Sequence, residues 1–248
     1  MVNLAVTSGC DEHVLFISTG VDWFPQIPSR WRVVRFKSLF RLIYRYPTYF
    51  NIEYVPEGIA EVRGEALTPD GFIETLPDER HISPETAALF PRTKLALGDI
   101  VMSVRGTMGK IGLVDERHVG ANITANMLRL SPYRHRVSGE FLRWLMRSRY
   151  FNEALNSIAP QTTIKTITMP QLAKLRVALP PKLEQEKLCE FLEKKIAAVK
   201  RIIAGIETQI ATLTAYRKSL IHECVTGQRR VTEADINRVK AHGQKEAS

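Results

Sequence analysis

The sequence has few cysteines, glycines and prolines, and it has no long apolar run. Three cysteines in 248 residues, Cys10, Cys189 and Cys224, are spaced for neither a zinc site nor a disulfide framework, which favours a reducing, cytoplasmic location. The 14 glycines and 13 prolines are too few for a collagenous or low-complexity chain. No stretch approaches the roughly 20 apolar residues of a membrane-spanning helix, and the start of the chain lacks a basic leader. We therefore expect neither a membrane segment nor an export signal.

Sequence signatures of catalysis and metal binding are also missing. The segment Gly106–Lys110 reads GTMGK, which lacks the glycine spacing of a phosphate loop, and Ile111 stands where that loop carries Ser or Thr. His222, Glu223 and Cys224 are consecutive on an expected helix, so they point in different directions and cannot converge on a metal ion. The sequence predicts no catalytic residue, no metal and no cofactor in this chain, although an enzyme whose site escapes motif recognition remains open.

Charge of one sign is abundant. The chain carries 35 Lys and Arg against 26 Asp and Glu, with a net charge of +9 and a pI near 9.6, which points to a polyanionic partner. The excess lies in residues 101–180, which hold 12 basic and four acidic side chains interleaved with aromatic residues. This pattern is typical of a nucleic-acid-binding surface. A solvated face balanced by the acidic stretch 51–100 explains the charge equally well.

The hydrophobic pattern predicts an α+β fold with one globular domain followed by a long helix. Strand-like alternation covers 31–40, two β-rich runs flank a turn at 106–109 in a hairpin pattern, and ANMLRLSP adds a strand. Ser138 is a good N-cap for a helix that leaves Arg143, Arg147 and Arg149 facing outward. We divide the chain into an N-terminal segment at 1–26, a mixed domain at 27–179, a helical spacer at 180–228 and a polar tail at 229–248.

Pro180 and Pro181 mark the boundary, because neither can enter a helix interior. From about Leu183 to Val225 the chain contains no proline, and Thr226-Gly227 provides a stop. Apolar residues then recur in steps of three and four, the seam of a coiled coil. The predicted interface residues are Leu192, Ile196, Val199, Ile203, Ile206, Ile210 and Leu213. A rod of roughly 65 Å, at 1.5 Å per residue, needs a partner helix along its length.

Four segments together resemble the DNA specificity subunit of Type I restriction-modification systems. They are VDWFPQIPSRWRVVRFKSLF (21–40), GDIVMSVRGTMGKIGLV (98–114), QTTIKTITMPQLAKLRVALPPKLEQEKLCEFLEKKIAAV (161–199) and YRKSLIHECVTGQ (216–228). The most specific signal is LPPKLEQ, then the heptad helix, then LIHECVTGQ, in that order.

The resemblance implies a DNA target recognition domain followed by a conserved helical spacer. Family members usually carry two such units in tandem, with their spacer helices packed antiparallel, so that two domains read a bipartite site. This chain has one unit, which leaves a homodimer or a truncated product of a longer gene. The resemblance also implies that the subunit does no chemistry: methyltransferase subunits modify adenine with S-adenosylmethionine, and a motor-nuclease subunit with ATP and Mg cleaves unmodified DNA.

DNA-binding candidates follow from residue chemistry, since Arg suits guanine edges and Lys, Ser or Thr suit phosphates. They lie at the hairpin turn, in a polar loop between two helices, and on the helix after Ser138. We predict Arg105, Thr107, Lys110, Gln161, Thr162, Thr163, Lys165, Arg143 and Arg147. A decoy that captures methyltransferase subunits without forming an active complex is the alternative function.

Overall fold

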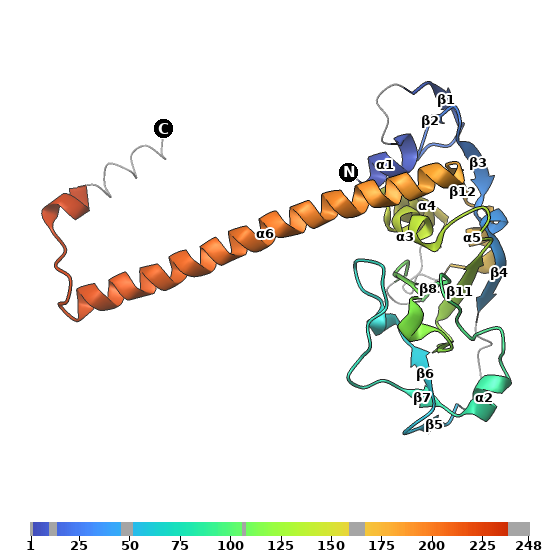
Figure 1. Cartoon of the computed structure of the whole chain (residues 1–248), viewed down its shortest axis with the longest axis horizontal. Coiled ribbons are helices and arrows are strands. Elements are labelled where there is room, and N and C mark those ends of the chain that lie inside the picture. The colour runs from blue at the N-terminus through green and yellow to red at the C-terminus, as the bar shows by residue number, and fades with distance from the viewer. Residues whose placement is uncertain (1, 10–13, 46–51, 106–107, 159–166, 238–248) are drawn as a thin grey trace. The chain divides into compact units, whose positions relative to one another are not determined.

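The computed structural model describes residues 2–9, 14–45, 52–105, 108–158 and 167–237 (Figure 1). The chain divides into two compact units, unit 1 at Met1–Glu193 and unit 2 at Lys194–Ser248. The predicted fold class, a mixed α/β domain followed by a long helix, is confirmed. Among the described residues, none of the helices combines the length and the apolar content that a bilayer crossing requires.

A four-stranded antiparallel sheet forms the centre of unit 1. Its strands run in the order β4 (Phe40–Arg45), β11 (Met127–Pro132), β8 (Ile100–Ser103) and β9 (Ile111–Leu113). The predicted hairpin is confirmed, because β8 pairs antiparallel with β9 and Val101 lies opposite Gly112. Gly109, in the connection, has a φ of 86°, which a glycine adopts without strain.

A second four-stranded sheet lies at the end of unit 1 opposite the start of the long helix (Figure 1). Its strands run in the order β10 (Asn122–Ile123), β6 (Ile59–Val62), β7 (His81–Ile82) and β5 (Tyr54–Val55). The pair β10–β6 is parallel and the other pairs are antiparallel. A buried apolar cluster joins the two sheets, with Val62 and Ile123 from this sheet and Val101 and Met127 from the central one.

Two short ribbons complete the β structure. The strands β1 (Phe16–Ser18) and β2 (Gln26–Pro28) pair antiparallel, as do β3 (Arg32–Arg35) and β12 (Arg176–Leu179). The strand expected over 31–40 is interrupted by the 3-10 turn η1 (Phe36–Leu39). The turn places Phe36 and Leu39, three residues apart, on one side of the chain, where both are fully buried.

The remaining elements of unit 1 are short helices. They are α1 (Val2–Ser8), α2 (Pro84–Ala88), α3 (Gly139–Arg147), α4 (Arg149–Ile158), α5 (Met169–Lys174), η2 (Gly64–Ala66) and η3 (Glu116–His118). Ser138 caps α3 as expected, because its Oγ accepts from the Phe141 N–H at 3.1 Å. The helix that we expected to continue past Arg147 breaks at Ser148, whose Oγ donates to the Leu145 carbonyl at 2.6 Å and accepts from the Phe151 N–H at 3.3 Å.

The long helix α6 (Lys182–Val225) has 44 residues and ends directly before Thr226-Gly227, as predicted. Its first part, through Glu193, belongs to unit 1, and Leu188 and Leu192 are buried there. The prediction that Leu192 lies in a coiled-coil interface is therefore wrong. Leu192 continues the apolar period of the helix, but its side chain fills the core of the domain.

A buried glutamine fixes the start of α6. The Gln185 side chain is fully buried, and its Nε2 donates to the carbonyls of Arg136 at 2.9 Å and Pro180 at 3.0 Å. Its Oε1 accepts from the Ser138 N–H at 3.1 Å. One amide thus satisfies three backbone groups near the beginnings of α3 and α6, which is a physical reason for the glutamine in the LPPKLEQ motif.

The substitution Gln185→Ala is expected to lower the free energy of unfolding of the full chain by about 2–3 kcal/mol, because it leaves these buried backbone groups without partners. Urea unfolding followed by circular dichroism measures the change. Gln209→Ala, at an exposed position of the same helix, is the matched control and should change stability little. Equal effects of the two substitutions would contradict the role of Gln185.

Candidate nucleic-acid interface

A polar cleft of about 560 Å³ opens between the hairpin β8–β9 and the sheet that contains β6. Four basic side chains line it: Arg63, Arg80, Arg105 and Lys110. Thr124, Asn126 and the carboxylates of Glu61 and Glu65 also line it. Positive charge combined with neutral hydrogen-bonding groups in a concave surface suits the phosphates and base edges of a nucleic acid.

Glu61 is a buried charged group of the cleft. Its side chain is 4% exposed, and its Oε2 accepts a hydrogen bond from the Tyr54 hydroxyl at 3.1 Å. The guanidinium of Arg80 lies 5.3 Å from the centre of the Tyr54 ring. Burial raises the pKa of Glu61, although the hydrogen bond from Tyr54 and the charges of Arg80 and Arg63 act in the opposite direction.

Two of the predicted DNA-binding residues meet at this cleft. Arg105 and Lys110, on either side of the hairpin turn, both line it and are exposed. Thr107 lies outside the described residues, as do Gln161, Thr162, Thr163 and Lys165. The prediction that the hairpin turn and the polar loop contact DNA therefore stays a prediction.

The expectation that Arg143 faces outward is wrong. Its side chain is 1% exposed, and its guanidinium lies 4.3 Å from the ring centre of Phe72 and 4.4 Å from that of Trp144. It forms ion pairs with Glu140 at 3.1 Å and with Glu193, the last residue of unit 1. A helical pattern alone missed this, because aromatic faces and carboxylates from distant segments make burial of the charge favourable.

The side chain of Arg147 is also bound to other groups of the domain. Its Nε donates to the Pro69 carbonyl at 3.0 Å, and its guanidinium pairs with Asp70 at 3.3 Å. Burial and the neighbouring charge of Arg143 lower the pKa of Arg147. The two arginines thus hold the turn before Phe72 instead of forming an outward patch, whereas Arg149 is 81% exposed and pairs with Glu153.

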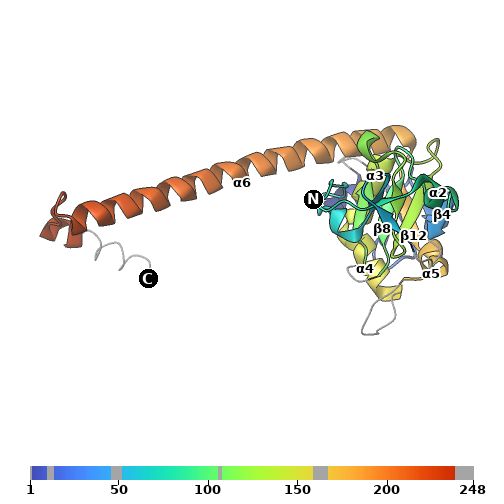
Figure 2. The same ribbon diagram turned by 90° about the horizontal axis from the view of Figure 1, so that it is seen from below.

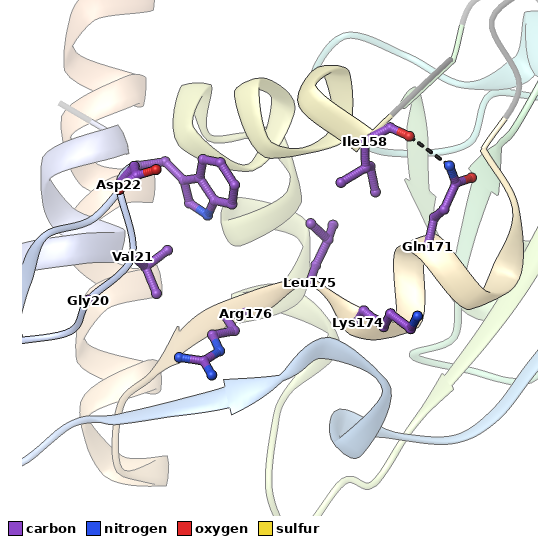
Figure 3. A pocket seen from close by; sticks show the side chains of 9 residues that line it. Gly20, Val21, Asp22, Ile158, Gln171, Lys174, Leu175 and Arg176 are labelled. Atoms are coloured by element: carbon purple, nitrogen blue, oxygen red, sulfur yellow. Dashed lines mark hydrogen bonds between the residues drawn. The ribbon is translucent and has the colours of Figure 1, made fainter.

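A smaller pocket, of about 260 Å³, lies beside α4 and α5 (Figure 3). Ile158 and Leu175 face one another across it, and Gln171 donates a hydrogen bond to the Ile158 carbonyl at 2.8 Å. Lys174 and Arg176 stand at its edge. Among the described residues, no three His, Cys, Asp or Glu side chains gather as a metal site requires.

The helix of unit 2 exposes a row of large apolar side chains. The six predicted interface residues that follow Leu192 all lie on this stretch: Ile196, Val199, Ile203, Ile206, Ile210 and Leu213. Ile196 is partly exposed, and the other five are 41–66% exposed. Thr208, Thr212 and Thr214 donate their hydroxyls to carbonyls four residues earlier, at 2.7–2.9 Å, so these polar groups are satisfied within the helix.

Comparison with known proteins identifies the family. The family model described as Type I restriction modification DNA specificity domain matches residues 28–212. The chain belongs to this family. The match covers the greater part of the chain and continues from the globular domain into α6, which confirms the resemblance seen in the sequence.

Two specificity subunits are among the relatives of this specificity domain. The chain is 25% identical over 149 residues to the Type I restriction enzyme EcoBI specificity subunit of Escherichia coli, which covers 60% of this chain and 31% of that protein. It is 23% identical over 237 residues to the MjaVIII specificity subunit of Methanocaldococcus jannaschii, which covers 93% of this chain and 53% of that protein. The chain thus spans about half, or less, of the length of these relatives.

Solved structures share the fold. One, from work on complex assembly and conformational transition of a type I restriction-modification system, aligns with a TM-score of 0.60 at 21% identity, over 84% of this chain and 48% of that one. The HsdS subunit from Thermoanaerobacter tengcongensis aligns with a TM-score of 0.53 at 20% identity, over 75% and 42%.

Sequence reasoning identified only two of the residues that line this specificity domain's cleft, Arg105 and Lys110. Tyr54, Glu61, Arg63 and Arg80 all lie in the stretch 51–100, which we considered only as the acidic stretch in the alternative explanation of the basic charge. Although this stretch has a net negative charge, it contains Arg63 and Arg80, which line the same cleft as Arg105. The alternation of Tyr54 and Val55 with polar neighbours is too short a signal to predict the sheet that contains β5 and β6.

Glu61→Gln is expected to raise the melting temperature of the chain near pH 7, with a gain that vanishes below about pH 4.5, the ordinary pKa of the carboxyl. The folded state favours the protonated form, because burial raises the pKa of Glu61. The stabilisation that protonated Glu61 contributes is therefore complete below pH 4.5, and it is lost as the pH rises through the folded-state pKa. Thermal unfolding at pH 4 and pH 7 measures the difference.

Glu57→Gln, on the exposed connection between β5 and β6, is the matched control and should leave both melting temperatures unchanged. A lower melting temperature of Glu61→Gln at neutral pH would mean that Arg63 and Arg80 stabilise the ionised carboxylate more than burial destabilises it.

Proposed function

We propose that this chain is a non-catalytic, single-unit DNA specificity subunit of a Type I restriction-modification complex, which directs adenine methylation and restriction to a bipartite DNA site. The observation that carries the proposal is the family match, because it includes both a recognition domain and the start of a helix long enough to connect two such domains. The named relatives, which are specificity subunits, support the same role.

DNA recognition is assigned to the cleft. Arg105 is suited to read a guanine edge and Lys110 to contact a phosphate, while Thr107 and the polar loop residues Gln161, Thr162, Thr163 and Lys165 complete the proposed surface. Arg63 and Arg80 add positive charge to the same cleft, which supports a polyanionic ligand there. Base reading from a concave surface also explains why neutral groups such as Asn126 lie among the charges.

The chemistry of the complex is assigned to partner subunits. Methyltransferase subunits would use S-adenosylmethionine, and a motor-nuclease subunit would use ATP and Mg. In this scheme the specificity subunit selects the DNA sequence on which the complex acts. It therefore needs surfaces for DNA and for other subunits rather than a catalytic centre.

The helix of unit 2 is assigned to pairing with a second copy of the chain. Its exposed isoleucines repeat in steps of three and four, so an unpaired helix would leave a continuous apolar seam in water. A two-fold symmetric dimer would read two inverted half-sites. Pairing would place two recognition domains in one assembly, and this chain alone spans only 53% of the longer MjaVIII relative.

A genome-wide map of methylated adenines in the source cell, with and without this gene, tests the function. Loss of one bipartite motif with inverted half-sites is the expected result. An asymmetric motif would mean that a second, different unit reads the other half. An unchanged map, with the gene expressed and methyltransferase subunits present, would contradict the specificity role.

The dimer is tested separately by Ile206→Asp, which places a charge in the apolar seam. We expect the wild-type chain to sediment as a dimer and the variant as a monomer, because an unpaired carboxylate cannot be buried between two helices at low cost. Thr208→Asp, on the opposite face of the helix, is the matched control and should remain a dimer. A monomeric wild-type chain would overturn the homodimer.

A further inference from the structure

Two stretches of the chain contain no acidic residue at all. Residues 23–52 hold six Arg and Lys and no Asp or Glu, and residues 154–183 hold four Arg and Lys and no Asp or Glu. They lie far apart in the sequence, but β3 belongs to the first and β12 to the second. The fold therefore concentrates positive charge from both stretches on one ribbon.

Six basic side chains are exposed on this ribbon and on the elements that adjoin it. We refer to these six side chains as the ribbon patch: Arg32, Arg35, Lys37, Arg41, Lys174 and Arg176. Because side chains alternate along a strand, Arg35 lies on the face of the ribbon that carries Arg176, and Arg32 lies on the other face. Within the described part of the chain, none of the six forms an ion pair with a carboxylate. Arg30, by contrast, is neutralised by Glu184, with Nε to Oε2 at 2.8 Å.

The register of the ribbon adds to this concentration of charge. Arg35 lies directly opposite Arg176 in the antiparallel pair β3–β12. Residues opposite one another in such a pair have Cβ atoms about 5 Å apart, and like charges there destabilise the sheet. An anion bound between the two guanidinium groups would be attracted by both of them and would offset their mutual repulsion.

The composition of the patch distinguishes a nucleic acid from a protein partner. Interfaces between proteins have an apolar centre, often with aromatic residues. In β3, η1, β4, α5 and β12, none of the described large hydrophobic side chains is among the exposed ones. Apart from the small pocket that Lys174 and Arg176 border, this surface presents charged groups without an apolar centre, which suits the sugar-phosphate backbone, because that backbone is bound by charge.

The patch is also separate from the cleft. None of its six residues lines the cleft, and Figure 1 shows β3, β12 and β4 along one side of unit 1, while β5, β6 and β7 lie at the end of the unit. Figure 2, the view from below, again shows β4 and β12 near one another. A DNA duplex is longer than one reading site, so a recognition domain gains affinity from a second, sequence-independent contact.

We propose that the ribbon patch binds the phosphate backbone of DNA beside the sequence that the cleft reads, and that it does so without sequence preference. This inference rests on the proposed function of the chain as a DNA specificity subunit. It adds a second contact to that function, which sets affinity and salt dependence but leaves the recognised motif unchanged.

The test uses the full chain and its Arg35→Gln/Arg176→Gln double variant with two DNA duplexes, one with the recognised motif and one without it. Affinity is measured at several salt concentrations. We expect the double variant to bind both duplexes more weakly by the same factor, roughly 10- to 100-fold at 0.1 M salt. The slope of log affinity against log salt should fall by about 1.8, because two phosphate contacts are lost. The selected motif should stay the same.

The matched control is Arg217→Gln/Lys218→Gln, which removes the same charge from exposed positions of the helix of unit 2 and should leave the slope unchanged. Folding is checked with the single variant Arg35→Gln, which should melt at a slightly higher temperature than the wild type at low ionic strength because it relieves the like-charge pair. A merely structural role of Arg35 would lower that temperature.

The outcomes separate the inference from the proposed function. If the wild-type chain selects no motif and binds no DNA, the proposed function fails and the inference fails with it. If the wild type selects a motif and the double variant keeps both the affinity and the salt slope, only the inference is overturned. If DNA binding is kept but the double variant no longer binds methyltransferase subunits, the patch is a protein interface and the inference is likewise overturned.

Discussion

The amide of Gln185 is the constraint on which the geometry of unit 1 depends. It holds the carbonyls of Arg136 and Pro180 and the Ser138 N–H, so the starts of α3 and α6 are fixed by one side chain. Leu188 and Leu192 then bury the apolar face of the next two turns. The first turns of α6 are thus part of the domain core.

Elements with strong local signals were predictable from the sequence, and elements defined by distant neighbours were not. The hairpin β8–β9, the cap at Ser138 and the end of α6 before Gly227 each follow from a few adjacent residues. The apolar period of α6 is also visible in the sequence, but the period does not show which of its residues pack into the domain core and which remain exposed. Leu192 and Ile196 look alike in the heptad, and only the packing separates them.

The distribution of charge along the sequence likewise predicts the site residues only in part. The region 101–180 has a large positive excess, yet Arg129 is 8% exposed and pairs with Asp99 at 2.6 Å, while Arg143 is buried between aromatic rings. A count of charges does not distinguish such internal ion pairs from surface groups. Arg63 and Arg80 are the reverse case, because they lie in a stretch with net negative charge and still line the cleft. Arg105 and Lys110 could be named from the sequence, since a hairpin turn exposes its flanks.

The pairing of β3 with β12 has a consequence for how the chain folds as it is made. Arg35 lies opposite Arg176, so β3 has no partner strand until nearly the whole domain has left the ribosome. Contacts between such distant residues form slowly, because a long loop must close first. A free strand edge in a nascent chain is a site for association with other chains. The arginines on this edge keep it charged during that interval, and like charges on neighbouring nascent chains oppose their pairing.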